Sequence, residues 1–399
     1  MPKIRRKGDG TLRVLDPGAD HHQPHEWWLE RREGSIVLIP AAPNVRKLYL
    51  EPTTRCNLRC LTCVRHVWED PTQDSQDMQM DTFRMLLEQA RDLTELRRIV
   101  FCGSGEPFSH PHVLEMMRLA RNRDLAVSVT TNGLLLDAEV CRELVAMGVD
   151  RLMVSIDGAE AHTYADVRGA RVSQVIENMQ LLNDAKRRLG ALLPTLEIGF
   201  VALKRNVGEL GGMAQLAADV SATHIVVSNV IAHSERMYRE VLYGYAPVRH
   251  LTSASWPVRL DDWVVWGTMD LPRMHWGAER RCSFVHDEAA VVGWDGAVVP
   301  CNALAHDYRY YTVDGRPKQV SRYVLGRIHQ KALADIWTSE EYCRFRADVR
   351  RVHFPSCPDC DLRDTCDLRQ RNEACWGCEP SCADCLYAQD IVRCPGAGR

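Results

Sequence analysis

Short apolar runs alternate with longer amphipathic stretches along much of the chain. The apolar runs are rich in β-branched residues, as in Arg98-Ile-Val-Phe101 and Arg151-Leu-Met-Val-Ser-Ile156. Such runs are typical of strands buried on both faces. Between them, apolar residues recur three and four positions apart, which predicts helices packed on a sheet. The predicted strands are 47–51, 98–101, 126–130, 151–156, 195–203 and 224–228, and the predicted helices are 80–93, 112–122, 137–147, 173–190 and 208–219.

Six repeated strand–helix units predict an α/β protein with a parallel sheet. They suit a partial (β/α)6 TIM-type barrel, in which chemistry takes place at the carboxyl ends of the strands. We divide the chain into a strand-rich flap at 1–45, this core at 46–230, a linker or insertion at 231–281, and a cysteine-rich C-terminal part at 282–399. The last part contains one predicted helix, at 331–349.

Composition and charge narrow the class of protein. The chain has 399 residues, of which 45% are apolar and 26% charged, and its formal net charge is −3. These values are ordinary for a globular protein and exclude a disordered chain or a charge-driven nucleic-acid binder. No apolar run approaches the ~18 residues of a membrane span, and the N-terminal region lacks the apolar stretch of a signal peptide. We therefore expect a cytoplasmic protein that acts without a membrane.

Sixteen cysteines are the unusual feature of the composition. In a reducing compartment such a count argues against a disulfide framework and for metal sites. Most of them fall into two groups, at 56–63 and at 282–394. The remaining three are expected to be small buried hydrophobic residues: Cys102, Cys141 and Cys343.

Cys56-x3-Cys60-x2-Cys63 follows directly after the first predicted strand of the core. Three thiolates on one short loop can hold three corners of a 4Fe–4S cluster. The fourth iron is then open to a small chelating molecule, as in open catalytic metal sites generally. The alternative is a zinc knuckle with His66 as the fourth ligand.

This loop, placed after the first strand of a six-unit barrel, resembles the radical S-adenosylmethionine (radical SAM) superfamily. The resemblance implies that the open iron chelates the amino and carboxylate groups of S-adenosylmethionine. It implies that reductive cleavage of this cofactor yields a 5′-deoxyadenosyl radical, which abstracts hydrogen from a substrate. It also implies a low-potential electron donor of ferredoxin or flavodoxin type and an anaerobic setting.

Polar residues at the other strand ends look like the cofactor contacts of the family. Gly103-Ser-Gly105-Glu106 resembles the Gly-Gly-Glu motif, whose carbonyl and carboxylate would accept hydrogen bonds from the cofactor ammonium group. Arg168 resembles an arginine that pairs with the cofactor carboxylate, with a surface position as the alternative. The contacts that the resemblance implies are Gly105, Glu106, Asn132, Ser155, Asp157 and Arg168, with Asn206 and Ser228 as weaker candidates.

One position departs from the pattern of the family. Members usually carry an aromatic residue just before the third cysteine, near the adenine, and Thr62 stands there instead. We expect the backbone of 226–229 to hold the adenine in its place.

The second cysteine group opens with Cys282-x13-Gly296-x4-Cys301, followed by Cys357-x2-Cys360-x5-Cys366. These spacings match the start of the SPASM domain, a radical SAM extension that carries two auxiliary 4Fe–4S clusters. The next cysteine would fall at Gln370, so the remaining ligands cannot be assigned one by one. One cluster plus a zinc site is the alternative. The expected metal ligands are Cys282, Cys301, Cys357, Cys360, Cys366, Cys375, Cys378, Cys382, Cys385 and Cys394.

Acidic residues among these cysteines are the candidates for a general base. A surface position is the alternative for each of them: Asp359, Asp361 and Asp364.

Segments 51–60, 101–106, 292–301 and the tail at 380–395 look like the tungsten-cofactor oxidoreductase maturases. This resemblance implies a tungsten-containing oxidoreductase as partner, with its cofactor or its polypeptide as substrate. The alternative is a peptide maturase of ribosomal-peptide or sulfatase type, acting on a precursor peptide. Such enzymes commonly begin with a winged-helix region, for which residues 1–45 are too short and too strand-like. A non-catalytic iron–sulfur or zinc scaffold, or an electron carrier, is the alternative of another class.

Overall fold

The structure is a computed structural model of the chain. It describes residues 43–244, 267–274, 280–357, 360–371, 373, 375–377 and 379–393, and the backbone of four strands nearer the N-terminus.

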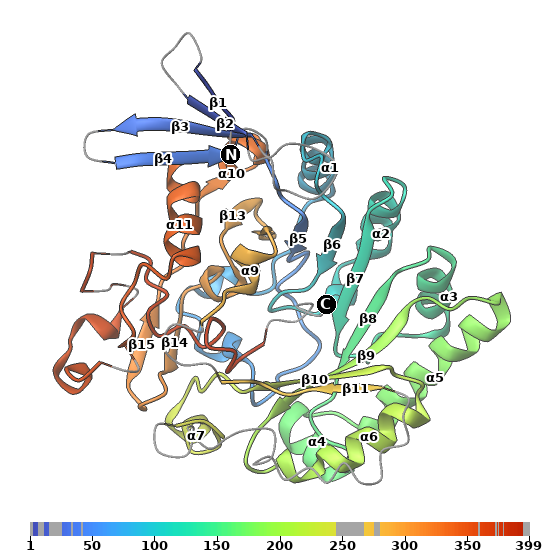
Figure 1. The fold of residues 1–399 in the computed structure, drawn as a ribbon. Helices are drawn as coiled ribbons and strands as arrows, with labels where there is room; N and C mark the ends of the chain where they lie inside the picture. Colours follow the sequence, from blue (N-terminus) through green and yellow to red (C-terminus); the bar gives the residue numbers. More distant parts are fainter. Residues whose placement is uncertain are drawn as a thin grey trace.

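A ten-stranded sheet organises the described part of the chain (Figure 1). Its strand order is β11-β10-β9-β8-β7-β6-β5-β12-β13-β16, and the six predicted strands lie side by side and parallel in chain order. They are β5 (Lys47–Leu50), β6 (Arg98–Phe101), β7 (Ala126–Thr131), β8 (Arg151–Ser155), β9 (Thr195–Ala202) and β10 (His224–Asn229). The end strands β11 (Thr268–Asp270) and β16 (Gly326–Arg327) do not pair with each other. The described sheet is therefore open, which confirms a partial barrel within an α/β fold.

The C-terminal region continues this sheet beyond the first core strand. Strand β12 (Ala289–Val292) pairs in parallel with β5, and β13 (Ala297–Val299) and β16 follow in antiparallel order. The exposed backbone groups of β5 explain this addition, because an edge strand is a template for a further strand. The boundaries of our four-part division stay predictions.

Helices cover one face of the parallel strands (Figure 1). The five predicted ones are α1 (Met80–Gln89), α2 (Val113–Arg121), α3 (Ala138–Ala146), α5 (Val172–Leu189) and α6 (Leu210–Asp219). Local capping explains where they begin, as at α3, where the Asp137 carboxylate accepts a hydrogen bond of 2.8 Å from the Val140 N–H.

Two features of the helices differ from the prediction. A further helix, α4 (Ala161–Arg168), lies between β8 and α5 and ends at Gly169, whose φ of 72° suits glycine. The helix predicted at 331–349 is two helices, α10 (Leu333–Trp337) and α11 (Glu340–Arg350), because the Ser339 hydroxyl caps a new helix N-terminus.

The remaining elements are short. Four strands near the N-terminus form a separate antiparallel sheet. They are β1 (Lys3–Arg6), β2 (Leu12–Leu15), β3 (Glu26–Arg32) and β4 (Ser35–Pro40). In the C-terminal half lie α7 (Glu235–Tyr238), α9 (Ser283–His286) and the hairpin of β14 (Tyr308–Tyr311) and β15 (Pro317–Val320).

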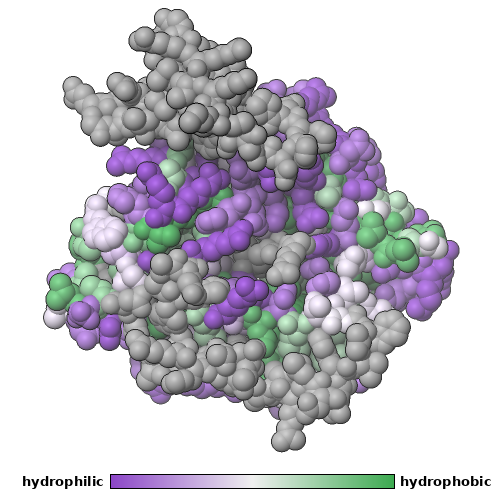
Figure 2. All heavy atoms as spheres, viewed as in Figure 1, coloured by the Kyte–Doolittle hydropathy of each residue, from purple (hydrophilic) through white to green (hydrophobic). Residues whose placement is uncertain are grey.

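The largest core cluster contains the residues packed between the sheet and its helices, including Cys141, whereas Cys102 belongs to a separate apolar cluster with Tyr49 and Val100. The three cysteines outside the two groups are all buried. Cys102, Cys141 and Cys343 are 3%, 0% and 6% exposed, as predicted. Figure 2 shows a mainly hydrophilic surface in which hydrophobic residues form small separate areas.

Candidate active site

The three cysteines of the first group lie on the loop after β5, at the carboxyl end of the strand. Backbone contacts fasten this loop to α4, since the Leu61 N–H donates a 2.7 Å hydrogen bond to the Val167 carbonyl. Cys60 is buried, whereas Cys56 and Cys63 are partly buried. The loop therefore presents three thiols from one anchored segment at the edge where a barrel places its chemistry.

His66 does not join these thiols as a fourth ligand. Its Nε2 lies 2.9 Å from the Cys60 carbonyl oxygen, so the ring braces the loop backbone. Within the described ranges, no three His, Cys, Asp or Glu side chains come close enough to hold a single metal ion. The position of His66 therefore does not fit the fourth ligand of a zinc knuckle.

Charges around the loop also suit a cluster. The pKa of the Cys60 thiol is raised to about 11, mainly by burial; Arg168 lowers it, and the charges of Asp157, Cys63 and Cys56 raise it. The three sulfurs are thus within electrostatic range of one another. Two N–H groups point at them, from Arg168 Nη1 to Cys60 Sγ at 3.9 Å and from Asn132 Nδ2 to Cys56 Sγ at 4.0 Å. Donors of this kind favour charged sulfur and tune iron–sulfur sites.

Gly105 lets the loop after β6 pack directly against the cysteine loop. A Cβ atom at this position would lie 2.2 Å from the Thr53 carbonyl oxygen and 2.7 Å from that of Arg55. The next residue, Glu106, donates its N–H to the Arg55 carbonyl at 2.8 Å. Only glycine permits this approach, so Gly105 helps to position the cysteines.

The Glu106 carboxylate is buried and satisfied within the chain. It accepts hydrogen bonds from the Thr131 hydroxyl (2.7 Å), the Asn132 N–H (2.7 Å) and the Phe108 N–H (3.1 Å). Burial raises the pKa of this carboxyl, and the three hydrogen bonds act in the opposite direction. Glu106 thus ties the ends of β6 and β7 together, and its contact with a cofactor ammonium group stays a prediction.

Arg168 and Asp157 form a buried ion pair behind the cysteine loop. Arg168 Nε lies 2.7 Å from Asp157 Oδ2, and the Val201 N–H donates to Asp157 Oδ1 at 2.8 Å. Burial by itself would lower the pKa of Arg168, but the charges of Asp157 and Cys60 raise it, so the guanidinium stays charged. Arg168 is 8% exposed, and the alternative of a surface position is wrong. Asn206 supports the pair by donating Nδ2 to the Asp157 carbonyl at 2.9 Å.

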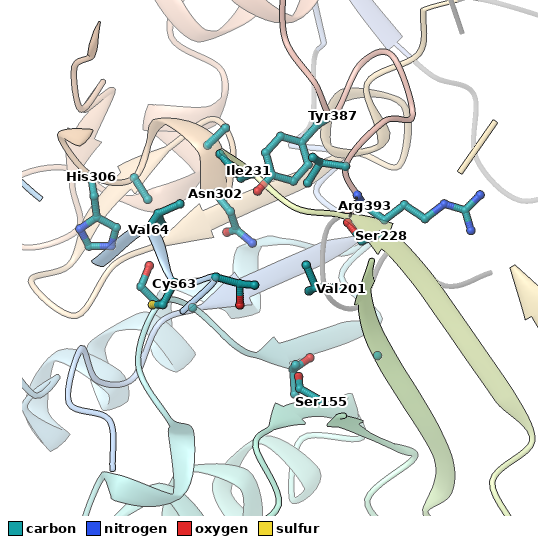
Figure 3. Close-up of a pocket in the computed structure, with 18 of the residues that line it drawn as sticks. Cys63, Val64, Ser155, Val201, Ser228, Ile231, Asn302, His306, Tyr387 and Arg393 are labelled. Carbon is teal, nitrogen blue, oxygen red and sulfur yellow. Dashed lines mark hydrogen bonds between the residues drawn. The ribbon is translucent and has the colours of Figure 1, made fainter. Parts of the chain in front are cut away.

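A cavity of about 310 Å³ opens at the carboxyl ends of the strands (Figure 3). Its lining includes several residues that were singled out in the sequence, namely Cys63, Ser155, Ser228 and Thr62. One wall comes from the core strands, through Thr130, Met153, Ser155, Gly199, Phe200, Val201, Val226, Ser228 and Asn229. The other comes from the C-terminal region, through Val291, Gly293, Asn302, Ala303, Ala305, His306 and Tyr308. The remaining predicted contacts are not in this lining: Gly105, Glu106, Asn132, Asp157 and Arg168.

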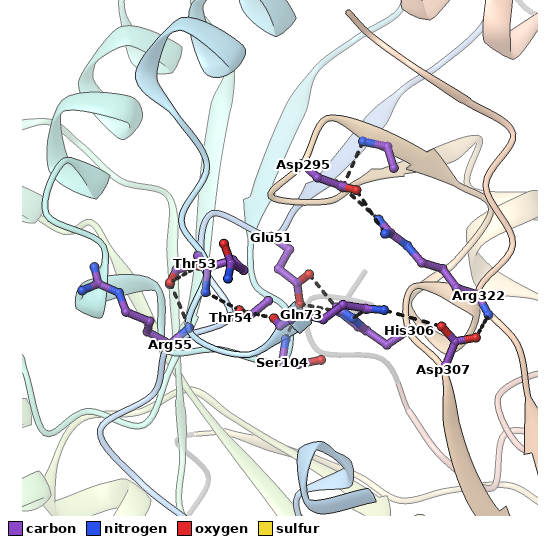
Figure 4. A network of polar contacts seen from close by, with 12 residues as sticks. Glu51, Thr53, Thr54, Arg55, Gln73, Ser104, Asp295, His306, Asp307 and Arg322 are labelled. Atoms are coloured by element: carbon purple, nitrogen blue, oxygen red, sulfur yellow. Dashed lines mark hydrogen bonds and ion pairs between the residues drawn. The ribbon is translucent and has the colours of Figure 1, made fainter. Parts of the chain in front are cut away.

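The cavity lining contains a buried carboxylate–imidazole pair that was not predicted from the sequence (Figure 4). His306 Nε2 lies 2.9 Å from Glu51 Oε2, and the Ser104 N–H donates to Glu51 Oε1 at 2.8 Å. The Trp68 ring stacks on the His306 ring with centroids 4.0 Å apart. Glu51 directly precedes the cysteine loop, which is a usable signal, but nothing around His306 in the sequence marks it.

Both ring nitrogens of His306 have polar partners. Gln73 Nε2 faces the carboxylates of Asp70 (3.2 Å) and Asp307 (3.5 Å), and Gln73 Oε1 lies 2.8 Å from His306 Nδ1. His306 is therefore held between Gln73 on one side and the Glu51 carboxylate on the other.

The C-terminal tail closes the cavity beside β10. The backbone N–H and Nδ2 of Asn229 both donate to the Ile391 carbonyl, at 3.2 Å and 2.9 Å. The Arg393 N–H donates to the Ser228 hydroxyl at 2.9 Å. Tyr387, Val392 and Arg393 line the cavity, with Tyr387 and Arg393 labelled in Figure 3.

The cysteines of the second group differ in exposure. Cys357 is buried and Cys375 is exposed. Cys378 and Cys394 lie outside the described residues. The others are partly buried: Cys282, Cys301, Cys360, Cys366, Cys382 and Cys385.

The candidate general bases near these cysteines are surface residues where the structure describes them. Asp361 and Asp364 are exposed, and Asp364 lies 3.7 Å from Arg316 in an exposed ion pair. Asp359 lies outside the described residues.

Comparison with known proteins agrees with this geometry. The model of the radical SAM superfamily matches residues 50–196, and the iron–sulfur cluster-binding domain SPASM matches residues 282–361. A protein of Pyrococcus furiosus described as "Tungsten-containing aldehyde ferredoxin oxidoreductase cofactor-modifying protein" is 36% identical over 354 residues, which cover 88% of this chain and 97% of that protein. The PqqA peptide cyclase of Streptomyces rochei is 28% identical over 48% of this chain and 50% of its own length.

Solved structures share the fold at low sequence identity. The peptide-bound form of anSMEcpe with AdoMet has a TM-score of 0.59 and 16% identity, over 86% of this chain and 95% of that one. Streptococcus suis SuiB bound to precursor peptide SuiA has a TM-score of 0.56 and 15% identity, over 83% of this chain and 72% of that one.

The fold, the cysteine loop and these matches define a radical SAM enzyme with an iron–sulfur cluster-binding C-terminal domain, which uses S-adenosylmethionine and 4Fe–4S clusters. Within that superfamily, the chain belongs to the family of the tungsten-containing aldehyde ferredoxin oxidoreductase cofactor-modifying protein. Among the described helices none is long and apolar enough to span a membrane.

Proposed function

We propose that this chain generates a 5′-deoxyadenosyl radical and uses it to mature a tungsten-containing oxidoreductase, by acting on its cofactor or its polypeptide. The observation that carries the proposal is the 36% identity to the Pyrococcus furiosus cofactor-modifying protein. Because this match spans 97% of that relative, it extends well beyond the core that radical SAM enzymes share.

In this proposal Cys56, Cys60 and Cys63 hold the catalytic cluster. Once bound, the cluster supplies the electron for reductive cleavage of S-adenosylmethionine. The chain contributes N–H groups from Arg168 and Asn132 toward two of the sulfurs. It also buries Cys60, which limits the access of water to this side of the loop.

The two walls of the cavity suggest where the ligands bind. The core wall offers the Ser155 hydroxyl and the backbone at Val226, Ser228 and Asn229, which suit the ribose and adenine of the cofactor. The opposite wall offers His306 and Tyr308, which we assign to the substrate together with Glu51, the core residue paired with His306. The radical carbon would then form between the two walls.

Cleavage of the cofactor tests the first half of the proposal. The protein, reconstituted anaerobically with iron and sulfide and reduced with dithionite, is expected to convert S-adenosylmethionine to 5′-deoxyadenosine and methionine. Cys60→Ala should abolish this conversion while iron bound in the C-terminal part remains. Cys343→Ala, which removes a buried thiol on α11, is the matched control and should keep full cleavage. Equal cleavage by Cys60→Ala would overturn the assignment.

The substrate is tested separately. The reduced enzyme is incubated with a tungsten-containing oxidoreductase isolated without the maturase, and both its cofactor and its polypeptide are analysed by mass spectrometry. A mass change that depends on S-adenosylmethionine and on Cys60 is expected in one of them. An active cleavage reaction with no change in either would refute the tungsten assignment alone.

A peptide-modifying maturase is the second candidate. The similarity to PqqA peptide cyclase over about half of the chain favours it. Against it, the described segments of residues 1–40 are the four strands of an antiparallel sheet. A crosslinked product from a short precursor peptide encoded beside the gene would establish this candidate over the first.

We further propose a low-potential ferredoxin or flavodoxin as the electron donor. Its supporting argument is chemical, because reductive cleavage by a 4Fe–4S cluster requires a low potential. The cytoplasm is the proposed location, since free thiols in this number persist in a reducing compartment.

A further inference from the structure

The cysteine loop has an outer side that faces solvent. Asn57 and Arg59, which stand between the first two cysteines, are exposed, and so is His66 just beyond the third. None of the three is among the described residues that line the reaction cavity. A cavity of about 310 Å³ is too small to admit a protein. A protein that delivers an electron to this loop therefore has to approach it from the outer side.

Two of the exposed side chains lead directly to the cysteines. The His66 ring places Nε2 2.9 Å from the Cys60 carbonyl oxygen. Asn57 Oδ1 accepts a 2.7 Å hydrogen bond from Asn132 Nδ2, and the same amide nitrogen lies 4.0 Å from Cys56 Sγ. A single layer of side chains thus separates this surface from two of the three cysteines, which gives an electron a short path.

Helices α4 and α7 border the loop through contacts with Leu61. Its N–H donates to the Val167 carbonyl of α4 at 2.7 Å, and its carbonyl oxygen lies 2.9 Å from Nε2 of His233. Arg171 lies four positions beyond Val167, directly before α5, and Arg236 lies three positions beyond His233, on α7. Both arginines are exposed. Each of them is therefore only a few residues away from a contact with the cysteine loop.

The outer side of the loop carries an excess of positive charge. Three exposed arginines contribute to this surface, which we call the loop surface: Arg59, Arg171 and Arg236. Within the described residues, none of the three takes part in an ion pair. Glu235, which precedes the last of them, is bound to Arg239 at 2.8 Å, and Asp166 on α4 is the exposed acid that opposes this charge in part. The local excess contrasts with the formal net charge of −3 for the whole chain.

We propose that a small acidic redox protein of the flavodoxin type docks on the loop surface, where its carboxylates meet Arg59, Arg171 and Arg236. Complementary charges of this kind steer the encounter and fix the orientation of the two proteins. One electron leaves the flavin hydroquinone anion, which becomes the neutral semiquinone, and enters the 4Fe–4S cluster of the loop without transfer of a proton. This inference rests on the proposed low-potential donor and is independent of the substrate.

Binding to the full-length, anaerobically reconstituted protein is measured first, with oxidised flavodoxin as the probe. Flavodoxin should slow hydrogen–deuterium exchange of residues 57–61 and 169–173. Arg171→Glu/Arg236→Glu should weaken the complex at least roughly tenfold at low ionic strength, which is the lower end of the range for electrostatic steering. Both effects should disappear at about 1 M salt, where the Debye length is about 3 Å.

A matched control variant reverses two exposed cations elsewhere, Arg188→Glu/Lys331→Glu. Arg188 lies near the opposite end of α5 from Arg171, about 25 Å along the helix axis. This variant changes the net charge by the same amount and should bind flavodoxin as the wild type does.

Electron transfer is followed by stopped-flow absorbance of the flavin semiquinone after mixing with reduced flavodoxin. For each variant, the rate of 5′-deoxyadenosine formation with flavodoxin is divided by its own rate with dithionite, a small reductant that needs no docking surface. This ratio should fall at least roughly tenfold in Arg171→Glu/Arg236→Glu and should stay at the wild-type value in the control variant.

Contrary outcomes are distinct. Equal binding by the two double variants would overturn the proposal, and so would slowed exchange confined to other segments. A complex weakened equally in both would show an effect of net charge alone and would also overturn it. Absence of cofactor cleavage with dithionite would instead contradict the proposed function, and the binding and exchange measurements do not depend on that reaction.

Discussion

Nε2 of His306 lies 2.9 Å from Oε2 of Glu51, although 255 positions separate the two residues in the chain. Glu51 follows the first core strand and His306 belongs to the C-terminal wall of the cavity, so the pair joins the two halves of the site. Both side chains are buried, at 5% and 3% exposure. A buried pair of this kind is costly to break, because removal of one partner leaves the other charge uncompensated.

Glu51→Gln should therefore destabilise the protein markedly. The substitution keeps the shape of the side chain but replaces one carboxylate oxygen by an NH2 group, so either His306 Nε2 or the Ser104 N–H loses its buried acceptor, which costs about 1–3 kcal/mol. Anaerobic urea unfolding at pH 7 measures the change. Glu235→Gln removes an exposed partner of Arg239 and should alter the free energy of unfolding by less than about 1 kcal/mol. Equal effects of the two substitutions would contradict the structural role of the pair.

The stabilisation by Glu51 should depend on pH. Burial raises its pKa, but His306 and the Ser104 N–H lower it more, so the folded value lies below the ordinary 4.5. A lowered carboxyl pKa stabilises the fold above the unfolded value, and this stabilisation disappears as the pH falls through the folded value. The difference in unfolding free energy between the wild type and Glu51→Gln should shrink as the pH is lowered from 5 toward 3 in urea titrations. A difference that stays constant over this range would refute the assignment.

Arg168→Met should unfold the region behind the cysteine loop. It leaves the Asp157 carboxylate buried without its cation, at a cost of about 3–5 kcal/mol in unfolding free energy. Removal of both charges in Arg168→Met/Asp157→Asn, which keeps an oxygen for the Val201 N–H, should recover most of the loss. Urea unfolding of the apoprotein measures both variants. A double variant as unstable as the single one would argue against a charge effect.

Gly105→Ala should displace the cysteine loop. The added methyl would lie 2.2 Å from the Thr53 carbonyl oxygen, a distance that requires the backbone to move. The expected result is loss of the loop cluster, measured as roughly four fewer irons per chain after reconstitution. Gly208→Ala is the matched control, because its Cβ would meet nothing within 4 Å. Full iron content in Gly105→Ala would show that this close approach is dispensable.

Asn229→Ala should loosen the tail. It removes the 2.9 Å hydrogen bond from Nδ2 to the Ile391 carbonyl, which is worth about 1 kcal/mol. Hydrogen–deuterium exchange of residues 386–393 should become roughly fivefold faster, and other segments should be unchanged. Asn183→Ala removes a similar bond to the Val220 carbonyl on the far side of the sheet and is the control. Unchanged exchange in the tail of Asn229→Ala would mean that this bond does not hold it.

Much of the core was predictable from local pattern. A strand such as Arg98–Phe101 is a continuous apolar run, and a helix such as Ala138–Ala146 begins at a capping aspartate, so both are encoded by neighbouring residues. Helix α4 was not predicted because it is short and because polar residues outnumber the apolar ones, such as Tyr164 and Val167, that it buries.

The sequence by itself determined the six strand–helix units, the three-cysteine loop and the presence of a second cysteine-rich part. Each of these follows from residues close together in the chain, whose spacing directly reflects backbone geometry or ligand chemistry. Only the tertiary structure decided that His306 faces Glu51 and that the tail closes the cavity on β10. Those contacts join segments that are far apart in the chain. They depend on how the C-terminal strands extend the sheet beyond β5, and no local sequence pattern predicts that extension.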